Sequence, residues 1–234
     1  MNSHEFHELT HYVMDSPYKP PAKLFIGGFD DWKVRARLAH FLAMPELKKH
    51  DEAIELLRTI VDVKVNEENP EEVEEKAYAL QRLAYCMRED KKYDDALHYI
   101  NLAVELIEST DYLYKYMLRG EVWADRWNIL HDIGDIQTAQ QEIDDKIEAY
   151  GKLPIKHNSY LYYGYRFKAQ MAATAMMKEE ALNYMRKALS YMEIPEAYTK
   201  AIEIAFSAKH DNVSWILNTI DHACPPTEKI HWDI

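Results

Sequence analysis

A short pattern that occurs four times restricts the fold of this chain more than any other feature. Each copy has two polar residues, usually acidic, then an alanine, then apolar residues at helical spacing. The alanines are Ala53, Ala96, Ala139 and Ala181, at intervals of 43, 43 and 42 residues. A small residue repeated at one register lets two helices approach closely. The interval therefore predicts a tandem repeat of helix pairs, each built around one alanine.

Amphipathic runs precede the alanines and supply the first helix of each expected pair. The clearest run is 77–89, which is followed by a short polar turn and then by the helix that contains Ala96. In the third copy, Gly134 and Asp135 predict the end of one helix and the N-cap of the next. Asn69, followed by a proline, predicts a helix start. The apolar residues that share one face of 77–89 are Leu80, Leu83, Ala84 and Met87.

This layout resembles the tetratricopeptide repeat family, in which each repeat is a helix, a turn and a second helix. The second copy matches the family spacing at Leu80, Leu83, Ala84, Met87, Ala96, Ile100 and Ala103, and the third adds Trp123, Gly134, Ala139, Ile143 and Pro154. The period is roughly nine residues longer than the family's period of about 34. We therefore expect longer helices or longer connections between pairs. Only the third copy has the glycine of the turn.

The resemblance covers residues 31–194, and a fifth pair is expected within 196–223. It implies an all-α, right-handed superhelical solenoid of about five antiparallel helix pairs. Residues 1–30 are expected to form a short helix, about 4–14, and a Pro-rich connecting arm, with the helical repeat domain following at 31–234. The short helix should cap the exposed end of the solenoid. The residues expected to do so are Phe6, Leu9 and Val13.

Charge, cysteine usage and hydropathy limit the partners and surroundings of the chain. The 234 residues carry a formal charge of −12, which repels nucleic acid and anionic membranes over most of the surface. Cys86 and Cys224 are the only cysteines, too few for a disulfide framework. The first residues lack the basic and apolar regions of a secretory signal, and no run of about 18 apolar residues occurs. We therefore expect a soluble cytoplasmic protein with no nucleic-acid or membrane partner.

One motif is typical of an enzyme. The segment His7-Glu8-Leu9-Thr10-His11 matches His-Glu-x-x-His, in which two histidines hold Zn²⁺ and the glutamate acts as a general base. Enzymes of that kind place the motif deep in a domain and add a third ligand downstream, whereas this motif begins at residue 7. Phosphate-binding loops and Gly-x-Ser-x-Gly do not occur. We expect no catalysis, no metal and no cofactor, and keep a zinc hydrolase as the least favoured alternative.

The resemblance also indicates where a ligand would bind, because the first helices of successive pairs line the concave face of such a solenoid. Three arginines among tyrosines on that face suit a protein or peptide with acidic groups and an apolar anchor. The residues expected in the groove are Tyr78, Gln81, Arg82, Tyr85, Arg88, Asn128, His131, Tyr163, Arg166 and Gln170.

The expected function is that of a protein- or peptide-binding adaptor, scaffold or regulatory module. One alternative is a bacterial sensor that binds signalling peptides and acts on a signalling protein, although only one short helix precedes the repeats. A homodimer through the C-terminal edge, which contains Trp215, Ile216 and Trp232, is an arrangement that the sequence leaves open. It also leaves open whether the Pro-rich arm occupies the groove.

Overall fold

All regular structure in the described part of the chain is helical. The computed structural model describes residues 1–109, 118–152 and 158–191, and no strand occurs among them. This confirms the predicted all-α class. The expected fifth helix pair, 196–223, lies outside the described residues, as does the C-terminal edge that contains Trp215.

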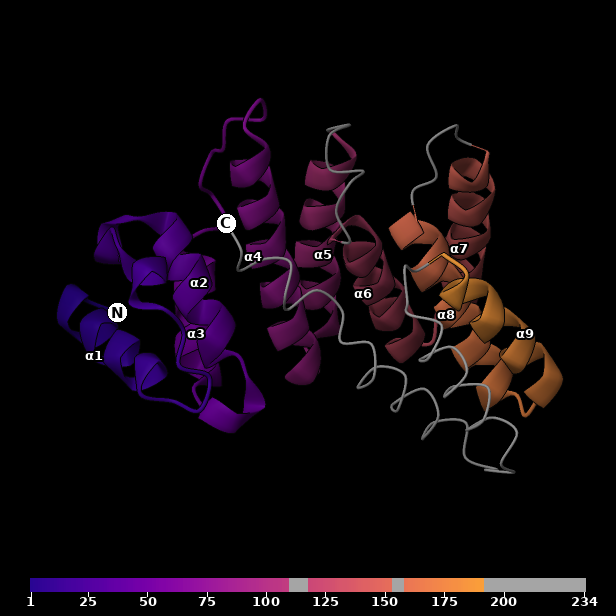
Figure 1. Cartoon of the computed structure of the whole chain (residues 1–234), viewed down its shortest axis with the longest axis horizontal. Coiled ribbons are helices and arrows are strands. Elements are labelled where there is room, and N and C mark those ends of the chain that lie inside the picture. The colour runs from indigo at the N-terminus through magenta and orange to yellow at the C-terminus, as the bar shows by residue number, and fades with distance from the viewer. Residues whose placement is uncertain (110–117, 153–157, 192–234) are drawn as a thin grey trace. The chain divides into compact units, whose positions relative to one another are not determined.

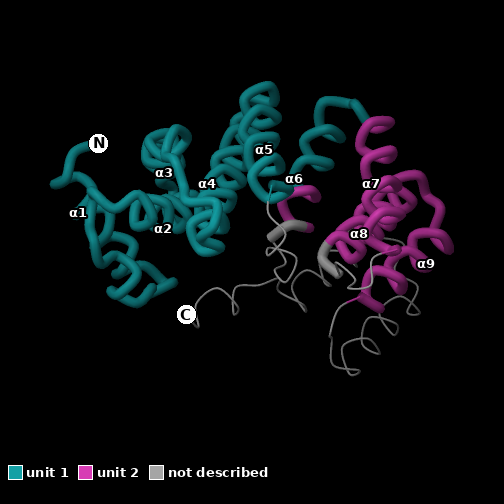
Figure 2. The backbone as a smooth tube through the Cα atoms, turned by 90° about the horizontal axis from the view of Figure 1, so that it is seen from above, with its two compact units in different colours: residues 1–113, 125–135 teal, residues 114–124, 136–234 magenta. Residues whose placement is uncertain are grey.

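The chain divides into two compact units, which Figure 2 shows in different colours. Residues 1–113 and 125–135 form unit 1, and residues 114–124 and 136–234 form unit 2. Helix α6 (Leu118–Asp132) is therefore shared, since its first part belongs to unit 2 and its second part to unit 1. The predicted boundary after residue 30 stays a prediction.

The helices occur in the order that the sequence predicted (Figure 1), and contacts are found within three of the predicted pairs, α2–α3, α4–α5 and α8–α9. Within unit 1, α2 packs on α3 and α4 packs on α5, and within unit 2, α8 packs on both α7 and α9. Besides part of α6, unit 1 contains α1 (Ser3–Met14), the 3₁₀ turns η1 (Ala22–Phe25) and η2 (Gly28–Asp30), α2 (Trp32–Leu42), the 3₁₀ turn η3 (Pro45–Leu47), α3 (His50–Arg58), α4 (Pro70–Glu89) and α5 (Tyr93–Glu108). Unit 2 contains α7 (Ile136–Gly151), α8 (Asn158–Thr174) and α9 (Lys178–Leu189).

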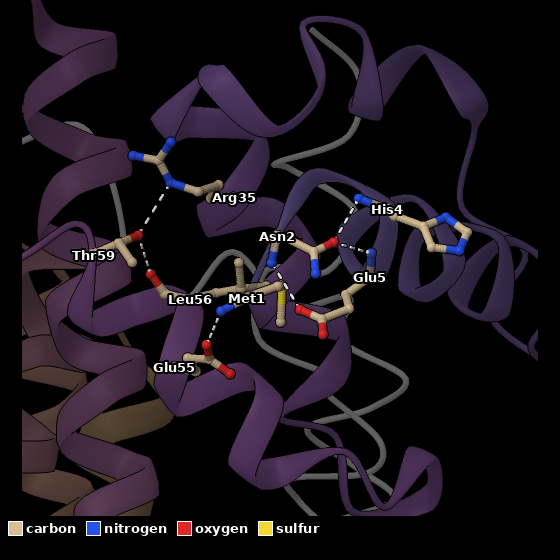
Figure 3. A network of polar contacts seen from close by, with 8 residues as sticks. All are labelled: Met1, Asn2, His4, Glu5, Arg35, Glu55, Leu56 and Thr59. Atoms are coloured by element: carbon tan, nitrogen blue, oxygen red, sulfur yellow. Dashed lines mark hydrogen bonds and ion pairs between the residues drawn. The ribbon is translucent and has the colours of Figure 1, made fainter.

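The predicted N-terminal helix is confirmed as α1, and it begins with a capping box. The side-chain oxygen of Asn2 accepts hydrogen bonds from the backbone N–H groups of His4 and Glu5 at 2.9 and 3.0 Å (Figure 3). The Glu5 carboxylate accepts one in return from the Asn2 backbone at 2.7 Å. Helix α1 contacts α2 and η2. Its buried residues are Phe6, Thr10 and Val13, whereas Leu9, which was expected among them, is half-buried.

The repeated alanines are buried in the packed interior. Ala53, Ala96 and Ala139 have no exposed surface, and Ala181 is 2% exposed. In unit 2 a glycine allows a second close approach, because a β-carbon at Gly164 of α8 would lie 3.0 Å from the Ile147 side chain of α7. Small residues thus set the distance between neighbouring helices.

The turn before each alanine contains one residue in the left-handed conformation in all four copies, although only one copy has glycine there. In the second to fourth turns the left-handed residue donates its N–H to the carbonyl three residues back, at 2.9–3.0 Å, and the next residue donates five residues back, at 2.8–2.9 Å. This is the Schellman motif, which usually takes glycine at the left-handed position. The left-handed residues are Lys48, Lys91, Gly134 and Met176, with φ of 53°, 61°, 86° and 62°.

Side chains of neighbouring helices hold the chain just beyond the end of α3. The ammonium group of Lys76, on α4, donates to the carbonyl of Ile60, and at 2.6 and 2.9 Å to those of Val61 and Val63. Arg35, on α2, donates to the hydroxyl of Thr59 at 3.1 Å (Figure 3). Lys76 is 5% exposed, and burial lowers its pKa to about 8, so the ammonium form still prevails at neutral pH. Lys76 thus provides donors for three backbone carbonyls just beyond the C-terminal end of α3.

Replacing Lys91 by glycine should stabilise unit 1, because a residue with a β-carbon in the left-handed conformation is destabilised by about 1–2 kcal/mol. After allowance for the greater freedom of glycine in the unfolded chain, we expect Lys91→Gly to raise the free energy of unfolding by about 0.5–1 kcal/mol. Urea denaturation followed by circular dichroism measures this change. The matched control is Lys91→Ala, which removes the same side chain and keeps the β-carbon. Equal free energies of unfolding for the two variants would contradict strain at this turn.

Candidate functional site

Seven of the expected groove residues belong to unit 1, and the structure places them on two helices. Asn128 and His131 lie on α6, and the other five recur every three or four positions along α4, so that they share one face. All seven side chains are half-buried. The five on α4 are Tyr78, Gln81, Arg82, Tyr85 and Arg88.

Two polar contacts of equal sequence separation join α4 to α6. The Gln81 amide donates to the Asp125 carboxylate at 2.7 Å, across 44 residues. The Arg88 guanidinium donates to the Asp132 carboxylate at 2.6 Å, also across 44 residues. These contacts fix the two helices side by side at two points of the same face. Asp132 was not predicted as the partner of Arg88, because the contact joins two helices 44 residues apart and leaves no local signal in the sequence.

A similar pair of contacts joins α2 to α4 on the other side. Arg37 donates to the Glu75 carboxylate at 2.7 Å, and the Tyr78 hydroxyl lies 3.0 Å from His40 Nδ1. Both pairs are separated by 38 residues. Helices α2, α4 and α6 are thus joined laterally within unit 1.

Tyr85 and Asn128 lie between the two contacts that join α4 to α6. Tyr85 is one helical turn from Gln81 and from Arg88, and Asn128 is one turn from each aspartate of the two contacts. Within the described residues, neither the Tyr85 hydroxyl nor the Asn128 amide makes a hydrogen bond. The side-chain oxygen of Gln81 is buried and has no partner there either. A hydroxyl, an amide and a carbonyl oxygen therefore stand close together with unused hydrogen-bonding capacity.

Arg82 is packed between two tyrosines. Its guanidinium carbon lies 5.6 Å from the ring centroid of Tyr78 and 5.4 Å from that of Tyr85. The guanidinium also donates to the Tyr78 hydroxyl at 3.2 Å. The same hydroxyl lies 3.0 Å from His40 Nδ1, so Tyr78 links the guanidinium of Arg82 to the imidazole of His40. Arg82 thus holds both tyrosine rings in place.

This arrangement differs from the expected cluster of arginines that face an acidic partner. Arg88 is neutralised by Asp132, and Arg82 is engaged by the faces of two aromatic rings. The interval between repeats brings a carboxylate to Arg88, which its position on α4 alone does not reveal. The face of unit 1 therefore offers neutral polar groups rather than a surplus of positive charge.

The three remaining expected residues lie on α8 in unit 2. Tyr163 is 6% exposed, and its hydroxyl donates to Glu121 of α6 at 3.0 Å. Burial, followed by the Glu121 carboxylate, raises the pKa of Tyr163 well above its usual value. Arg166 is half-buried and Gln170 is exposed. Tyr163 therefore joins two helices within unit 2.

A cluster of aromatic rings around Lys146 was not predicted. The ammonium nitrogen of Lys146, on α7, lies 4.1 Å from the ring centroid of Trp123, 5.2 Å from that of Tyr150 and 5.6 Å from that of Tyr160. The rings of Tyr150 and Tyr160 are stacked, with centroids 3.9 Å apart. Three helices of unit 2 thus meet around one cation. The contacts depend on tertiary packing, for which the sequence provides no local signal.

The His-Glu-x-x-His segment lies on the exposed side of α1. His7, Glu8 and His11 are all exposed. Among the residues that the structure describes, no group of three or more histidine, cysteine or acidic side chains is arranged to hold a metal ion. The third protein ligand that a catalytic zinc site requires is therefore not found in this part of the chain.

Comparison with protein-family models, curated proteins and solved structures found no match to this chain. No helix in the described ranges has the length and apolar character needed to cross a membrane.

A carboxyl group with a raised pKa lies one helical turn before Tyr78 on α4. Burial, together with the negative charges of Glu75 and Glu71, raises the pKa of Glu74 to about 7. Its ordinary value is 4.5, so the folded chain favours the protonated form relative to the unfolded chain. The destabilisation from ionising Glu74 develops as the pH rises from 4.5 to 7 and is complete above that range.

Replacing Glu74 by glutamine should therefore stabilise the protein more at pH 8 than at pH 5. We expect the difference in the free energy of unfolding, variant minus wild type, to rise by about 1–2 kcal/mol between these pH values, less than the full shift implies because the side chain is partly exposed. Urea denaturation at both pH values measures it. Glu68→Gln, at an exposed position before α4, is the control. A difference of the same size at both pH values would show that Glu74 ionises freely in the folded chain.

Proposed function

We propose that this chain is a binding module of the tetratricopeptide repeat kind, which holds a protein or peptide segment against the α4 and α6 face of unit 1. Support comes from the helix pairs, from the buried alanine at each repeat position and from the left-handed residue five positions before it. The lateral contacts across 38 and 44 residues also support it, because they join equivalent helices of successive repeats.

The observation that carries this proposal is the unused hydrogen-bonding capacity between the two contacts that join α4 to α6. A buried carbonyl oxygen without a donor, such as that of Gln81, destabilises a protein by about 1–3 kcal/mol. Because this oxygen is covered in the free chain, a ligand N–H group would satisfy it only after the Gln81 side chain turns toward the surface. The Asn128 amide offers both a donor and an acceptor, as a peptide backbone requires. Tyr85 adds a large apolar surface with a polar end, a property common at binding interfaces.

The proposed role is that of an adaptor or regulatory module in the cytoplasm. Binding of this kind needs neither a cofactor nor a reactive side chain. The partner is a protein or peptide whose main-chain amides and carbonyls meet Gln81, Tyr85 and Asn128. Ion pairs with the partner contribute little to the proposed binding, because the nearest arginines already interact with Asp132 and with aromatic rings.

Site-specific photo-crosslinking tests this proposal. A benzophenone amino acid placed at Tyr85 should capture a partner in the native cell extract, and adding Asn128→Ala to the same protein should reduce the yield several-fold. The matched control places the same group at Tyr99, a half-buried tyrosine of α5, the second helix of the pair. Capture at position 85 and not at 99 is the expected result.

Equal capture at both positions, or a yield at position 85 that Asn128→Ala leaves unchanged, would contradict the proposed face. A product in which the chain is linked to a second copy of itself would assign the face to a homodimer. Circular dichroism of each variant checks that the helices are retained.

A further inference from the structure

Two histidines on the exposed side of α1 lie within hydrogen-bonding distance of each other. His7 Nε2 and His11 Nε2 are 3.1 Å apart, and the ring centroids are 4.4 Å apart at an angle of 89°. The two residues are separated by one helical turn, so that their side chains project from the same side of α1. Both are exposed to solvent.

The backbone that carries these histidines is held at its start and along its inner side. The capping box formed by Asn2 and Glu5 fixes the first turn of α1 (Figure 3). On the inner side, the rings of Phe6 and Phe29 meet edge-on with their centroids 5.6 Å apart. The Thr10 hydroxyl donates to the Phe6 carbonyl at 2.9 Å. The distance between positions 7 and 11 is thus set by a packed helix and not by a free peptide.

The separation of the two nitrogens fits a shared metal ion. With metal–nitrogen distances of 2.0–2.1 Å, two ligands of a tetrahedral ion lie about 3.3 Å apart, and two adjacent ligands of a square or octahedral ion lie about 2.9 Å apart. The observed 3.1 Å falls between these values. Neutral imidazole is a good ligand for Zn²⁺, Ni²⁺ and Cu²⁺.

We propose that His7 and His11 bind one divalent transition-metal ion through their Nε2 atoms, with its remaining positions open to water or to a side chain of a partner. Affinity should follow the general order of such sites, with Cu²⁺ bound more tightly than Ni²⁺ or Zn²⁺. The metal would link two turns of α1 and so stabilise the helix that packs against α2 and η2.

The neighbouring groups on the same side distinguish this site from a hydrolytic one. The Glu8 carboxylate lies 3.6 Å from His4 Nε2, one turn earlier on the helix. A catalytic zinc site has three protein ligands, and no such group is present among the described residues. The site formed by His7 and His11 therefore binds metal and does not provide the ligand set for hydrolysis.

Isothermal titration calorimetry of the full chain with NiCl₂, in a non-chelating buffer at pH 7.5, tests the proposal. Free imidazole is largely neutral at that pH. We expect one saturable ion per chain in the wild type, and a loss of affinity of at least about tenfold in His7→Ala and in His11→Ala. Hydrogen exchange provides a local measurement, since Ni²⁺ should slow exchange of the α1 amides in the wild type and not in these variants.

Two matched controls distinguish the pair from the other histidines. His98→Ala, at an exposed position on α5, and His4→Ala, on α1 itself, should both bind Ni²⁺ as the wild type does. The proposal would be overturned by wild-type affinity in both His7→Ala and His11→Ala, or by no saturable binding to the wild type. A loss in His4→Ala as large as that in His11→Ala would also overturn it, because the ligands would then not be His7 and His11 alone.

Discussion

The packing of helices around four buried alanines is the constraint on which the described structure depends. Ala53, Ala96 and Ala139 have no exposed surface, so a larger side chain at any of them would push the facing helix away. The chain must also reverse direction within a fixed number of residues before the alanine. This requirement imposes the left-handed turn even where the residue is Lys91 or Met176. The strain in these turns is therefore a consequence of tertiary packing and not a preference of the turn residues.

The polar contacts among α2, α4 and α6 determine which side chains on the face of unit 1 are still available to bind a partner. Asp132 neutralises Arg88, and the aromatic rings of Tyr78 and Tyr85 engage Arg82, so these positive charges serve the fold. Uncharged groups with hydrogen-bonding capacity remain between the contacts. They are suited to a main chain, which every protein partner has, and the selection among partners would then come from the side chains beside it.

The sequence predicted the features that depend on the spacing of residues along the chain. Helical periodicity and the interval between alanines located the pairs, and the spacing of Phe6 and Val13 located the inner side of α1. The turn at Lys91 was not predicted, because a side chain with a β-carbon gives no sign of a positive φ. The partner of Arg88 and the cluster around Lys146 depend on contacts between repeats. The five predicted site residues on α4 share one face of that helix, but the role of the arginines required the structure.

The buried ammonium group of Lys76 differs in its chemistry from the other lysines in the part of the chain that the structure describes. Its three donors point at carbonyls, and 5% of the residue is exposed. An amine-reactive reagent, or an enzyme that acetylates lysine, therefore has no access to this nitrogen while the end of α3 stays attached to α4. The rate at which Lys76 becomes labelled then measures how often that attachment opens, which makes it an intrinsic probe of local unfolding within unit 1.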